Sequence, residues 1–469
     1  MGERRHIVDI VDDLDRSRGG DPALTIGDDT WSFARLSEES RRAASRLDAL
    51  GLKQDEVVVL PSANSHEQVA LFLGAWRLGA TPLPLSKDVP DAELRHIMAA
   101  AGAGLVLREG QQLANEPLWD RPNLIATRCR AQASGGSTGT PKVIVDTEPN
   151  TVDPEEDHWG WSEGPALFVP GPTFHSGPMN HLIGGLTRGV HVVMMRKFDA
   201  NEATSLIARH RAHWALFVPT MMNRILKVGG DMRARLASLK RVWTSAAYCP
   251  AWLKQEWIDI VGPDAIWEIF GGSEGVSTTI ISGREALDRP GSVGRAAGNG
   301  EIAILDSDGN RLPPGEVGEI YMRNRVDARR FVVISEVKQR LRQDWESFGD
   351  LGWLDEDGYL YLADRRVDMI NTGGQNVFPA EVEDAIQSHP AVGDAVVFGQ
   401  RDDDLGEIVC ARVYAENGGV TEAELLEYLA TRITRYKIPR RVEFSDAPIR
   451  NDAGKVRRTD LAAAPQTTA

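Results

Sequence analysis

Short β-rich runs alternate with helical patterns over the first two thirds of this 469-residue chain, and this alternation constrains its fold more than any other feature. The apolar run at 56–60 predicts a buried strand, and the apolar stripe over 65–78 predicts the helix that follows. We expect a second pair, with a helix at 91–101 capped by Asp91 and a strand at 104–107. The pattern then returns, with strands at 166–169, 190–195, 214–218 and 239–245 and helices at 201–212 and 250–261. Such alternation predicts layered α/β structure with largely parallel sheets.

The sequence pattern changes near residue 300. Runs at 301–305 and 318–322 are typical of antiparallel strands around an Asp- and Gly-rich turn. The later segment alternates helices and strands, at 380–388, 395–399, 407–414, 421–433 and 441–445. That pattern predicts a small α+β domain of about a hundred residues. We place the boundary in the charged stretch 364–368, so that residues 1–366 form a large domain and residues 367–469 a small one.

Composition excludes several classes of function. The formal net charge of −15 argues against general binding to nucleic acid or to a membrane surface. Basic residues nevertheless gather in the C-terminal tail, at Arg440, Arg441, Arg450, Lys455, Arg457 and Arg458. The three cysteines, Cys129, Cys249 and Cys410, are far apart and predict neither a metal site nor a disulfide framework. We find no apolar signal core and no apolar run long enough to span a bilayer, so we expect a cytoplasmic protein.

Residues 134–142, with the sequence SGGSTGTPK, place three glycines, four hydroxyls and a lysine within nine positions. Glycine allows positive φ and close backbone approach, and successive exposed N–H groups form a concavity that favours anions. Such a loop suits a triphosphate or a pyrophosphate. It differs from the P-loop, because Lys142 follows Thr-Pro rather than a final glycine. By itself the segment is equally typical of a surface turn.

Further motifs follow in a fixed order. They are TFHSGP at 173–178, FGGSE at 270–274, GDLGW at 349–353, DR at 364–365, NTGGQNVFPAEVE at 371–383 and NDAGK at 451–455. Each is weak or moderate alone, but the ordered set is specific and covers nearly the whole chain. On these motifs the chain resembles the adenylate-forming superfamily, which contains acyl-CoA synthetases, firefly luciferase and the adenylation domains of nonribosomal peptide synthetases.

A closer resemblance rests on residues 218–224, 252–255 and 363–366. There the chain looks most like bacterial CoA ligases for bulky acids, notably bile-acid–CoA ligases. The resemblance implies a large N-terminal domain of layered α/β sheets with a distorted β-barrel, and a small mobile α+β C-terminal domain. It also implies a two-step reaction that uses ATP, Mg²⁺ and coenzyme A. A carboxylate attacks the α-phosphate of ATP, giving an acyl-adenylate and pyrophosphate, and the thiol of CoA then displaces AMP.

The resemblance assigns nucleotide-binding roles to residues spread along the chain. The phosphates would be bound by Ser134, Gly135, Gly136, Ser137, Thr138, Gly139 and Lys142. Phe270, which replaces the usual tyrosine, would stack on the adenine, and Ala246, Ala247 and Gly271 would complete this part of the site. Asp350 would accept both ribose hydroxyls, and Arg365 would contact the ribose or a phosphate.

The same resemblance implies the catalytic groups. Lys455 would bridge the substrate carboxylate and the α-phosphate, a role that suits an ammonium point charge. Glu274 would bind Mg²⁺, and Ser273 keeps the hydroxyl of the usual threonine. His175 would gate or pack the acyl pocket, although a purely structural histidine is nearly as consistent with its loop. Gly373 and Gly374 would leave room for the pantetheine arm of CoA once the small domain rotates.

Two departures from the family pattern leave alternatives open. Val367 stands at the hinge position, where the family usually has Asp or Lys, and residues 324–346 do not fit the pattern. The protein could therefore perform only the second half-reaction, on an acyl-adenylate made elsewhere. It could also load a carrier protein, or bind nucleotide without turnover. A homodimer likewise stays open.

The acyl pocket is expected to be apolar, with small residues on its floor. Candidate wall residues are Phe174, Met179, Trp214, Met221, Met222, Trp243 and Tyr248, although each could equally belong to the core. Candidate floor residues are Gly184, Ala246, Ala247, Gly271, Gly272 and Gly275. No Asp stands where relatives that activate amino acids bind the α-amine. We therefore expect a bulky hydrophobic acid, with polycyclic steroid- or diterpenoid-like acids among the candidates.

Overall fold

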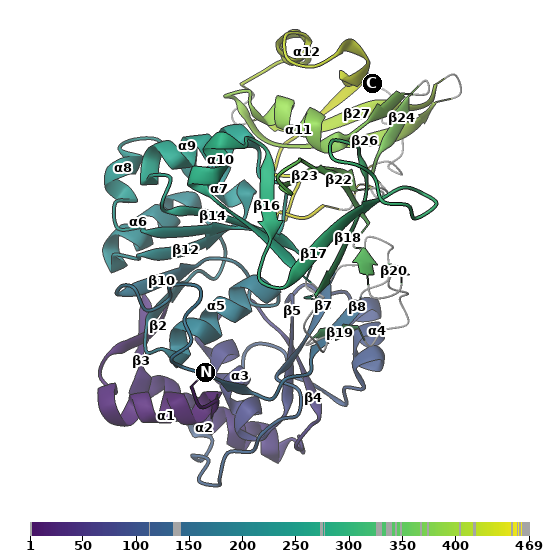
Figure 1. Cartoon of the computed structure of the whole chain (residues 1–469). Helices are drawn as coiled ribbons and strands as arrows, with labels where there is room; N and C mark the ends of the chain where they lie inside the picture. The colour runs from purple at the N-terminus through teal and green to yellow at the C-terminus, as the bar shows by residue number, and fades with distance from the viewer. Residues whose placement is uncertain are drawn as a thin grey trace.

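The computed structural model describes residues 2–111, 113–134, 142–272, 275, 277–324, 331–333, 340–342, 345–347, 349–365, 368–372, 375–402, 405–415, 419–451, 454–456, 458 and 461. Its helices are α1 (Ile7–Arg18), α2 (Phe33–Ala49), α3 (His66–Arg77), α4 (Asp91–Ala101), α5 (Ser176–Thr187), α6 (Ala200–His210), α7 (Pro219–Leu226), α8 (Met232–Arg235), α9 (Ala251–Val261), α10 (Gly283–Asp288), α11 (Pro379–Gln387) and α12 (Glu422–Ala430). They divide between a large N-terminal body and a small C-terminal one (Figure 1).

The large body is organised around a long mixed sheet. Its parallel part consists of β10 (Ala166–Val169), β11 (His191–Met194), β12 (Trp214–Phe217), β13 (Arg241–Thr244), β14 (Ile266–Gly271) and β2 (Pro22–Ile26). Side chains alternate between the two faces of each strand. Trp214 and Leu216 thus pack in the core on the side of α5, whereas Ala215 and Phe217 pack in the core on the side of α6, α7 and α9. The predicted α/β class with largely parallel strands is confirmed.

A second parallel sheet, made of β4 (Val57–Pro61), β5 (Thr81–Leu85) and β6 (Leu105–Val106), lies in the lower half of Figure 1. The helix predicted after its first strand is α3, and the side chain of Ser65 caps it by accepting from the N–H of Gln68. The predicted cap of α4 is wrong. Pro90 occupies the N-cap position, and Asp91 is the first helical residue, where its charge still favours the positive end of the helix dipole.

The antiparallel part of the long sheet extends from β14 through β15 (Thr278–Ser282), β16 (Ser292–Ala296), β23 (Leu360–Arg365) and β22 (Asp350–Leu354) to β18 (Gly318–Asn324). β17 (Gly300–Leu305) pairs with β18, as the sequence predicts for this hairpin. The structure also describes part of residues 324–346, the segment that does not fit the family pattern. β20 (Arg340–Arg342) pairs with β21 (Trp345–Ser347), and β19 (Phe331–Val333) pairs with β8 (Lys142–Asp146). The long sheet also carries β3 (Asp29–Ser32), and β1 (Arg5–His6) pairs with β9 (Thr151–Val152).

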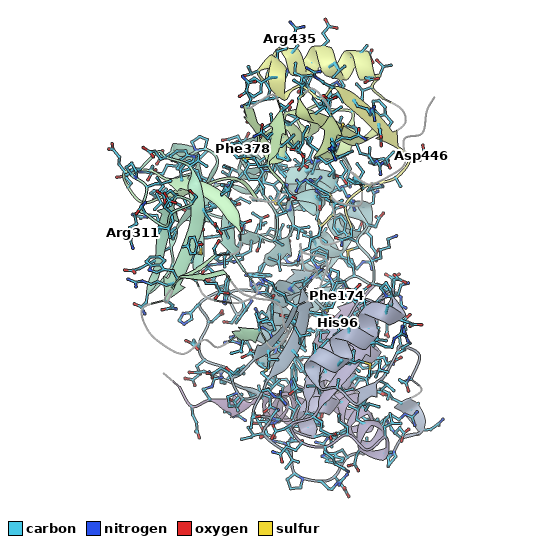
Figure 2. The ribbon with its side chains drawn as sticks, turned by 90° about the vertical axis from the view of Figure 1, so that its right-hand side faces the viewer. His96, Phe174, Arg311, Phe378, Arg435 and Asp446 are labelled. Carbon is cyan, nitrogen blue, oxygen red and sulfur yellow. The ribbon has the colours of Figure 1, made fainter. Side chains whose placement is uncertain are left out.

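The small body begins with β24 (Ile370–Thr372) and β25 (Gln375–Val377) and continues with β26 (Val392–Asp402), β27 (Gly406–Ala415) and β28 (Arg441–Ser445). These strands form one sheet, and α11 and α12 pack on it around a core that includes Val382, Val397 and Leu425. Figure 2 shows Phe174 midway along the large body and Arg435 at the far end of the small one. The proposed domain boundary stays a prediction, because Arg366 and Val367 lie outside the described residues.

No helix in the described part of the chain has both the length and the apolar character needed to cross a membrane.

Candidate functional site

Several of the predicted site residues that the structure describes lie near one edge of the parallel sheet. β10, β12, β13 and β14 run parallel to one another, so their carboxyl ends meet at the same edge. Open α/β sheets bind ligands at this edge. The segments that end or follow these strands carry His175, Thr220, Ala246 and Phe270.

His175 lies at the N-terminus of α5, as its N-cap residue, and its side chain makes no capping hydrogen bond. The sequence predicts a loop over 173–178, but the helix already begins at Ser176. The Nε2 atom of His175 is buried and has no hydrogen-bond partner among the described residues. Burial, together with the nearby charge of Lys455, lowers the pKa of His175 to about 3. The imidazole is therefore neutral at physiological pH, and its buried Nε2 still has the capacity for a hydrogen bond.

Ala246 adopts a backbone conformation that is rare for a residue with a side chain, with φ of +74°. It follows β13, and Ala247 comes directly after it. Such a conformation costs roughly 1–3 kcal/mol and tends to occur where the backbone faces a ligand. The strained turn therefore supports the assignment of this Ala-Ala pair to the site.

Phe270 and Asp350 come from neighbouring parts of the long sheet. Phe270 packs against the core cluster that contains Ile320 and Leu360. Asp350 begins β22 and lies directly opposite Arg365, the last residue of β23. The hairpin of β22 and β23 thus places the backbones of these two residues side by side, and their roles toward the ribose and a phosphate stay predictions.

Two paired strands flank the glycine-rich segment. Ser134 ends β7 (Arg130–Ser134) and pairs with Lys142, which begins β8. The loop therefore connects two antiparallel strands, unlike a P-loop, which leads from a strand into a helix. The predicted residues that lie outside the described part of the chain are Gly135, Gly136, Ser137, Thr138, Gly139, Ser273, Glu274, Gly373 and Gly374. The side chains of Ser134 and Arg365 lie outside it as well.

Lys455 lies on a compact turn of the small body. The side-chain oxygen of Asn451 accepts from the N–H of Lys455 at 2.9 Å, and the N–H of Asn451 donates to the carbonyl of Lys455 at 3.0 Å. Gly454 takes φ of +71° within this turn. A Cβ at Gly454 would stand 3.3 Å from Oγ1 of Thr220, so the turn lies against the start of α7 in the large body. The fold thus brings Lys455 close to His175, although the two are far apart in the sequence.

The described residues supply types of group that a nucleotide and a carboxylic acid require. Phe270 supplies a flat ring, Asp350 supplies two acceptor oxygens, and Lys142 and Lys455 supply two cations. The unpartnered Nε2 of His175 adds a polar atom for the acid. No group of three or more His, Cys, Asp or Glu side chains within the described ranges could hold a metal ion, so Glu274 stays a prediction as the Mg²⁺ ligand.

Most of the expected pocket walls belong to the core. Met179, Trp214, Met221, Met222 and Trp243 are at most 3% exposed and pack within the two large core clusters. Phe174 and Tyr248 are half-buried. Of the two alternatives that the sequence leaves open for these five side chains, their burial favours a place in the close-packed core over a place in the pocket wall.

Aromatic rings fill the space behind α5. The Trp159 ring stands edge-on to Trp243 at 4.7 Å and to His181 at 5.4 Å. Trp161 donates from Nε1 to Nδ1 of His181 at 3.0 Å, and a Cβ on Gly184 would stand 2.6 Å from the Trp161 ring. Since α5 leads away from His175, these rings pack beside the helix beyond the histidine.

The two bodies also touch away from the lysine turn. Lys227, at the end of α7, donates to the backbone carbonyl of Val392. Asp384 of α11 faces Trp252 of α9, and burial raises the pKa of the Asp384 carboxyl to about 6. These contacts hold the small body in the position that presents Lys455.

Some residues near the site are missed by sequence reasoning. Thr220 is visible only as part of a helix start, and nothing in the local sequence shows that the lysine turn packs on it. Asn451 could have been found, because an Asn four residues before the lysine is a common way to cap a turn.

Comparisons with known proteins agree with this geometry. The family description "AMP-binding enzyme" matches residues 12–130 and 127–329, and "AMP-binding enzyme C-terminal domain" matches residues 381–455. The chain is 30% identical to the long-chain-fatty-acid–CoA ligase FadD13 of Mycobacterium tuberculosis, over 92% of both proteins. It is 28% identical to the indoleacetate–CoA ligase of Aromatoleum aromaticum, over 97% of this chain and 98% of that protein.

Among solved structures, o-succinylbenzoate CoA synthetase of Bacillus subtilis with its acyl-adenylate intermediate aligns over 100% of both chains, with a TM-score of 0.80 and 23% identity. The same enzyme with ATP and magnesium aligns over 98% of this chain and 100% of that one, with a TM-score of 0.79 and 23% identity. At this identity the likeness establishes the fold.

Proposed function

Because this chain belongs to the AMP-binding enzymes and is an AMP-forming acid–thiol ligase, we propose that the edge described above is its active site and that its substrate is a hydrophobic carboxylic acid. The enzyme uses ATP, Mg²⁺ and coenzyme A, and converts the acid to its CoA thioester through an acyl-adenylate. Within this reaction, Lys455 neutralises the charge that develops where the carboxylate meets the α-phosphate.

One observation carries the residue assignment. The Asn451–Lys455 turn of the small body lies against Thr220 at the carboxyl edge of the parallel sheet, and there its ammonium group comes near His175. This position corresponds to the first half-reaction. In this proposal the adenine stacks on Phe270, the ribose hydroxyls donate to Asp350, and Lys142 binds a phosphate. Glu274 would hold Mg²⁺, which neutralises phosphate charge.

For the acid, a compact hydrophobic molecule has the better support. The five expected wall residues that pack in the core, and the rings behind α5, argue for a short pocket. The bulky, steroid- or terpenoid-like acid expected from the sequence stays a prediction. A panel of acids incubated with ATP, Mg²⁺ and CoA and read by mass spectrometry separates the two. Thioesters of small aromatic or medium-length acids support the compact pocket, and turnover of polycyclic acids alone contradicts it.

Substitution of Lys455 by alanine tests the catalytic assignment. We expect Lys455→Ala to slow acyl-adenylate formation by roughly 100-fold or more, because it removes a charge that stabilises the transition state. Formation of thioester from a synthetic acyl-adenylate should change by no more than about threefold, since the lysine takes no part in that step. Pyrophosphate release measures the first rate, and CoA thioester the second.

Lys437→Ala is the matched control, because Lys437 is in the same small body and pairs with Glu381 on its surface. Equal losses in both half-reactions for Lys455→Ala would contradict the assignment. If the unmodified enzyme releases no pyrophosphate but does use a synthetic acyl-adenylate, it is a half-reaction enzyme. If it ignores free CoA and acylates a carrier protein, it is a loader. A cytoplasmic location and a homodimer stay predictions.

A further inference from the structure

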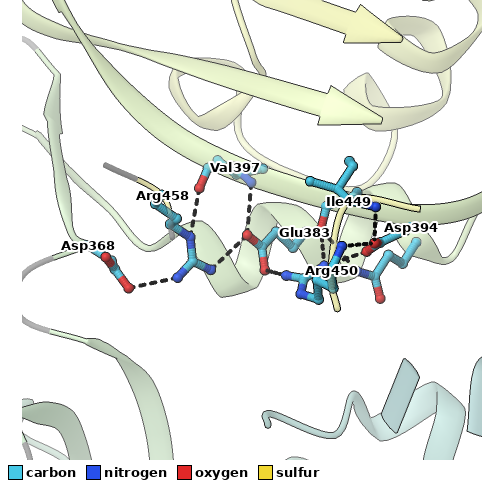
Figure 3. A network of polar contacts seen from close by, with 9 residues as sticks. Asp368, Glu383, Asp394, Val397, Ile449, Arg450 and Arg458 are labelled. Carbon is cyan, nitrogen blue, oxygen red and sulfur yellow. Dashed lines mark hydrogen bonds and ion pairs between the residues drawn. The ribbon is translucent and has the colours of Figure 1, made fainter. Parts of the chain in front are cut away.

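Two arginines flank the lysine turn, and both bind the same carboxylate. Arg450, before the turn, donates from Nη2 to Oε2 of Glu383 at 2.5 Å, and Arg458, after it, donates from Nη2 to Oε1 of Glu383 at 2.7 Å. Figure 3 shows Glu383 between the two guanidinium groups. In the sequence these arginines belong to a group of basic residues near the C-terminus, which would suit a solvated tail. The structure instead places them inside the small body, bound to acidic side chains.

Each arginine has a second anchor. Arg450 donates from Nη1 to Oδ1 of Asp394 at 2.6 Å, and the other oxygen of Asp394 accepts from the backbone N–H groups of Ile449 and Arg450 at 2.9 and 2.8 Å. Arg458 donates from Nη1 to Oδ2 of Asp368 at 2.7 Å and from Nε to the carbonyl of Val397 at 2.9 Å. Both stems of the turn are therefore fixed to the body of the domain.

Glu383 is placed to join these stems. It lies on α11, it is 6% exposed, and its Oε1 also accepts from the backbone N–H of Val397 at 2.8 Å. Seven residues lie between Arg450 and Arg458, and the eight steps of chain from one to the other could extend to about 26 Å. Two guanidinium groups held this close repel each other unless an anion lies between them. The Glu383 carboxylate supplies that anion and closes the base of the loop.

The loop that it closes carries Lys455. Above the two arginines, the hydrogen bonds between Asn451 and Lys455 leave the turn few alternative conformations. We propose that Glu383 is a positioning residue for adenylation: by binding Arg450 and Arg458 together it fixes the turn that presents Lys455 to the substrate. The inference rests on the proposed role of Lys455. It adds that the position of the ammonium group depends on a carboxylate that need not touch the substrate.

Glu383→Gln tests the proposal, since glutamine keeps the shape of the side chain and loses its charge. We expect the rate of acyl-adenylate formation to fall roughly 10- to 100-fold, the loss that follows a misplacement of about 1 Å. Thioester formation from a synthetic acyl-adenylate should stay within about twofold of the unmodified enzyme. The melting temperature is measured on the same samples.

The matched control is Glu443→Gln. Glu443 accepts from Nε and Nη2 of Arg412 in the same small body, but this pair has no link to the lysine turn. The control should change neither half-reaction. If Glu383→Gln fails to fold, Arg458→Lys gives the same comparison, because lysine keeps the charge but cannot bind Asp368, Glu383 and Val397 together.

The outcomes separate this inference from the proposed function. If Glu383→Gln, like Lys455→Ala, slows acyl-adenylate formation but not thioester formation, the result supports Glu383 as a positioning residue. Equal loss of both half-reactions, or no loss, overturns it and leaves Lys455 in place. If Lys455→Ala itself spares adenylation, the proposed role of the lysine fails, and the inference fails with it.

Discussion

At the scale of single residues, His175 has the most informative surroundings. Its ring is neutral because burial, reinforced by the charge of Lys455, lowers its pKa to about 3. Its buried Nε2 has no partner among the described residues. A neutral imidazole can bind an acid group by a hydrogen bond, but it does not act as a cation or change its charge near neutral pH.

His175→Asn should therefore slow adenylation by about tenfold, the value of one lost hydrogen bond to a charged group. The loss should be constant from about pH 5.5 to about pH 8.5, because the imidazole does not titrate there. Rates of pyrophosphate release across this range provide the measurement. A loss that disappears at either end of the range would show that the histidine changes its charge during the reaction.

At the scale of elements, α5 lies unusually close to the sheet and to the loop beside it. Its two central glycines allow this approach. A Cβ on Gly184 would stand 2.6 Å from the Trp161 ring, and one on Gly185 would stand 2.6 Å from Leu167 and from Val192. Since His175 is the N-cap of α5, the depth of this packing also sets the position of the imidazole.

Gly184→Ala should destabilise the protein by about 1–3 kcal/mol, because the Trp161 ring is packed too tightly to move away from a new methyl group. The higher helix propensity of alanine offsets this by about 1 kcal/mol at most. Chemical denaturation measures the free energy of unfolding. Asn180→Ala, at an exposed position of the same helix, is the control and should leave stability nearly unchanged. A stabilised Gly184→Ala would show that α5 has room to shift.

At the scale of the whole molecule, buried histidines couple stability to pH. Burial lowers the pKa of His175 and His181 to about 3 and that of His191 to about 4. In the unfolded chain these rings titrate near 6.5. As the pH falls below 6.5, the unfolded chain takes up protons that the folded chain does not, so the free energy of unfolding decreases. Asp384, with its pKa raised to about 6, acts in the opposite direction, as do Glu67 and Glu268, whose pKa values burial also raises. Burial lowers the pKa of other histidines as well, which adds to the effect of the three rings, among them His6, His66, His210 and His213.

The melting temperature should therefore fall by several degrees between about pH 7 and about pH 5. His191→Gln should make this fall shallower, since it removes one of the three rings and can keep the hydrogen bond to Thr25. His158→Gln is the control, because the His158 side chain is 78% exposed. A melting temperature that rises on acidification, or a slope that His191→Gln leaves unchanged, would contradict this account.

Several features could be predicted from the sequence because each depends on a few neighbouring residues. The apolar period of 65–78 is sufficient to predict α3, and the helix–strand order of the small domain is confirmed element by element. The order of the motifs is sufficient to predict an adenylate-forming ligase. The motifs also point to Asp350 and Arg365 as nucleotide-binding residues, but that they lie opposite each other in one hairpin comes from the structure.

Other features depend on how distant segments meet, and only the tertiary structure decides them. The large aromatic side chains of Trp214 and Trp243 suit a pocket wall as well as a core. The packing of α5 against the sheet places both in the core. The charge of Arg450 and Arg458 suits a solvated tail, and the position of α11 directs both to Glu383. Short-range patterns determine which elements form, whereas burial and charge pairing depend on which elements pack together, and that information is spread over the whole chain.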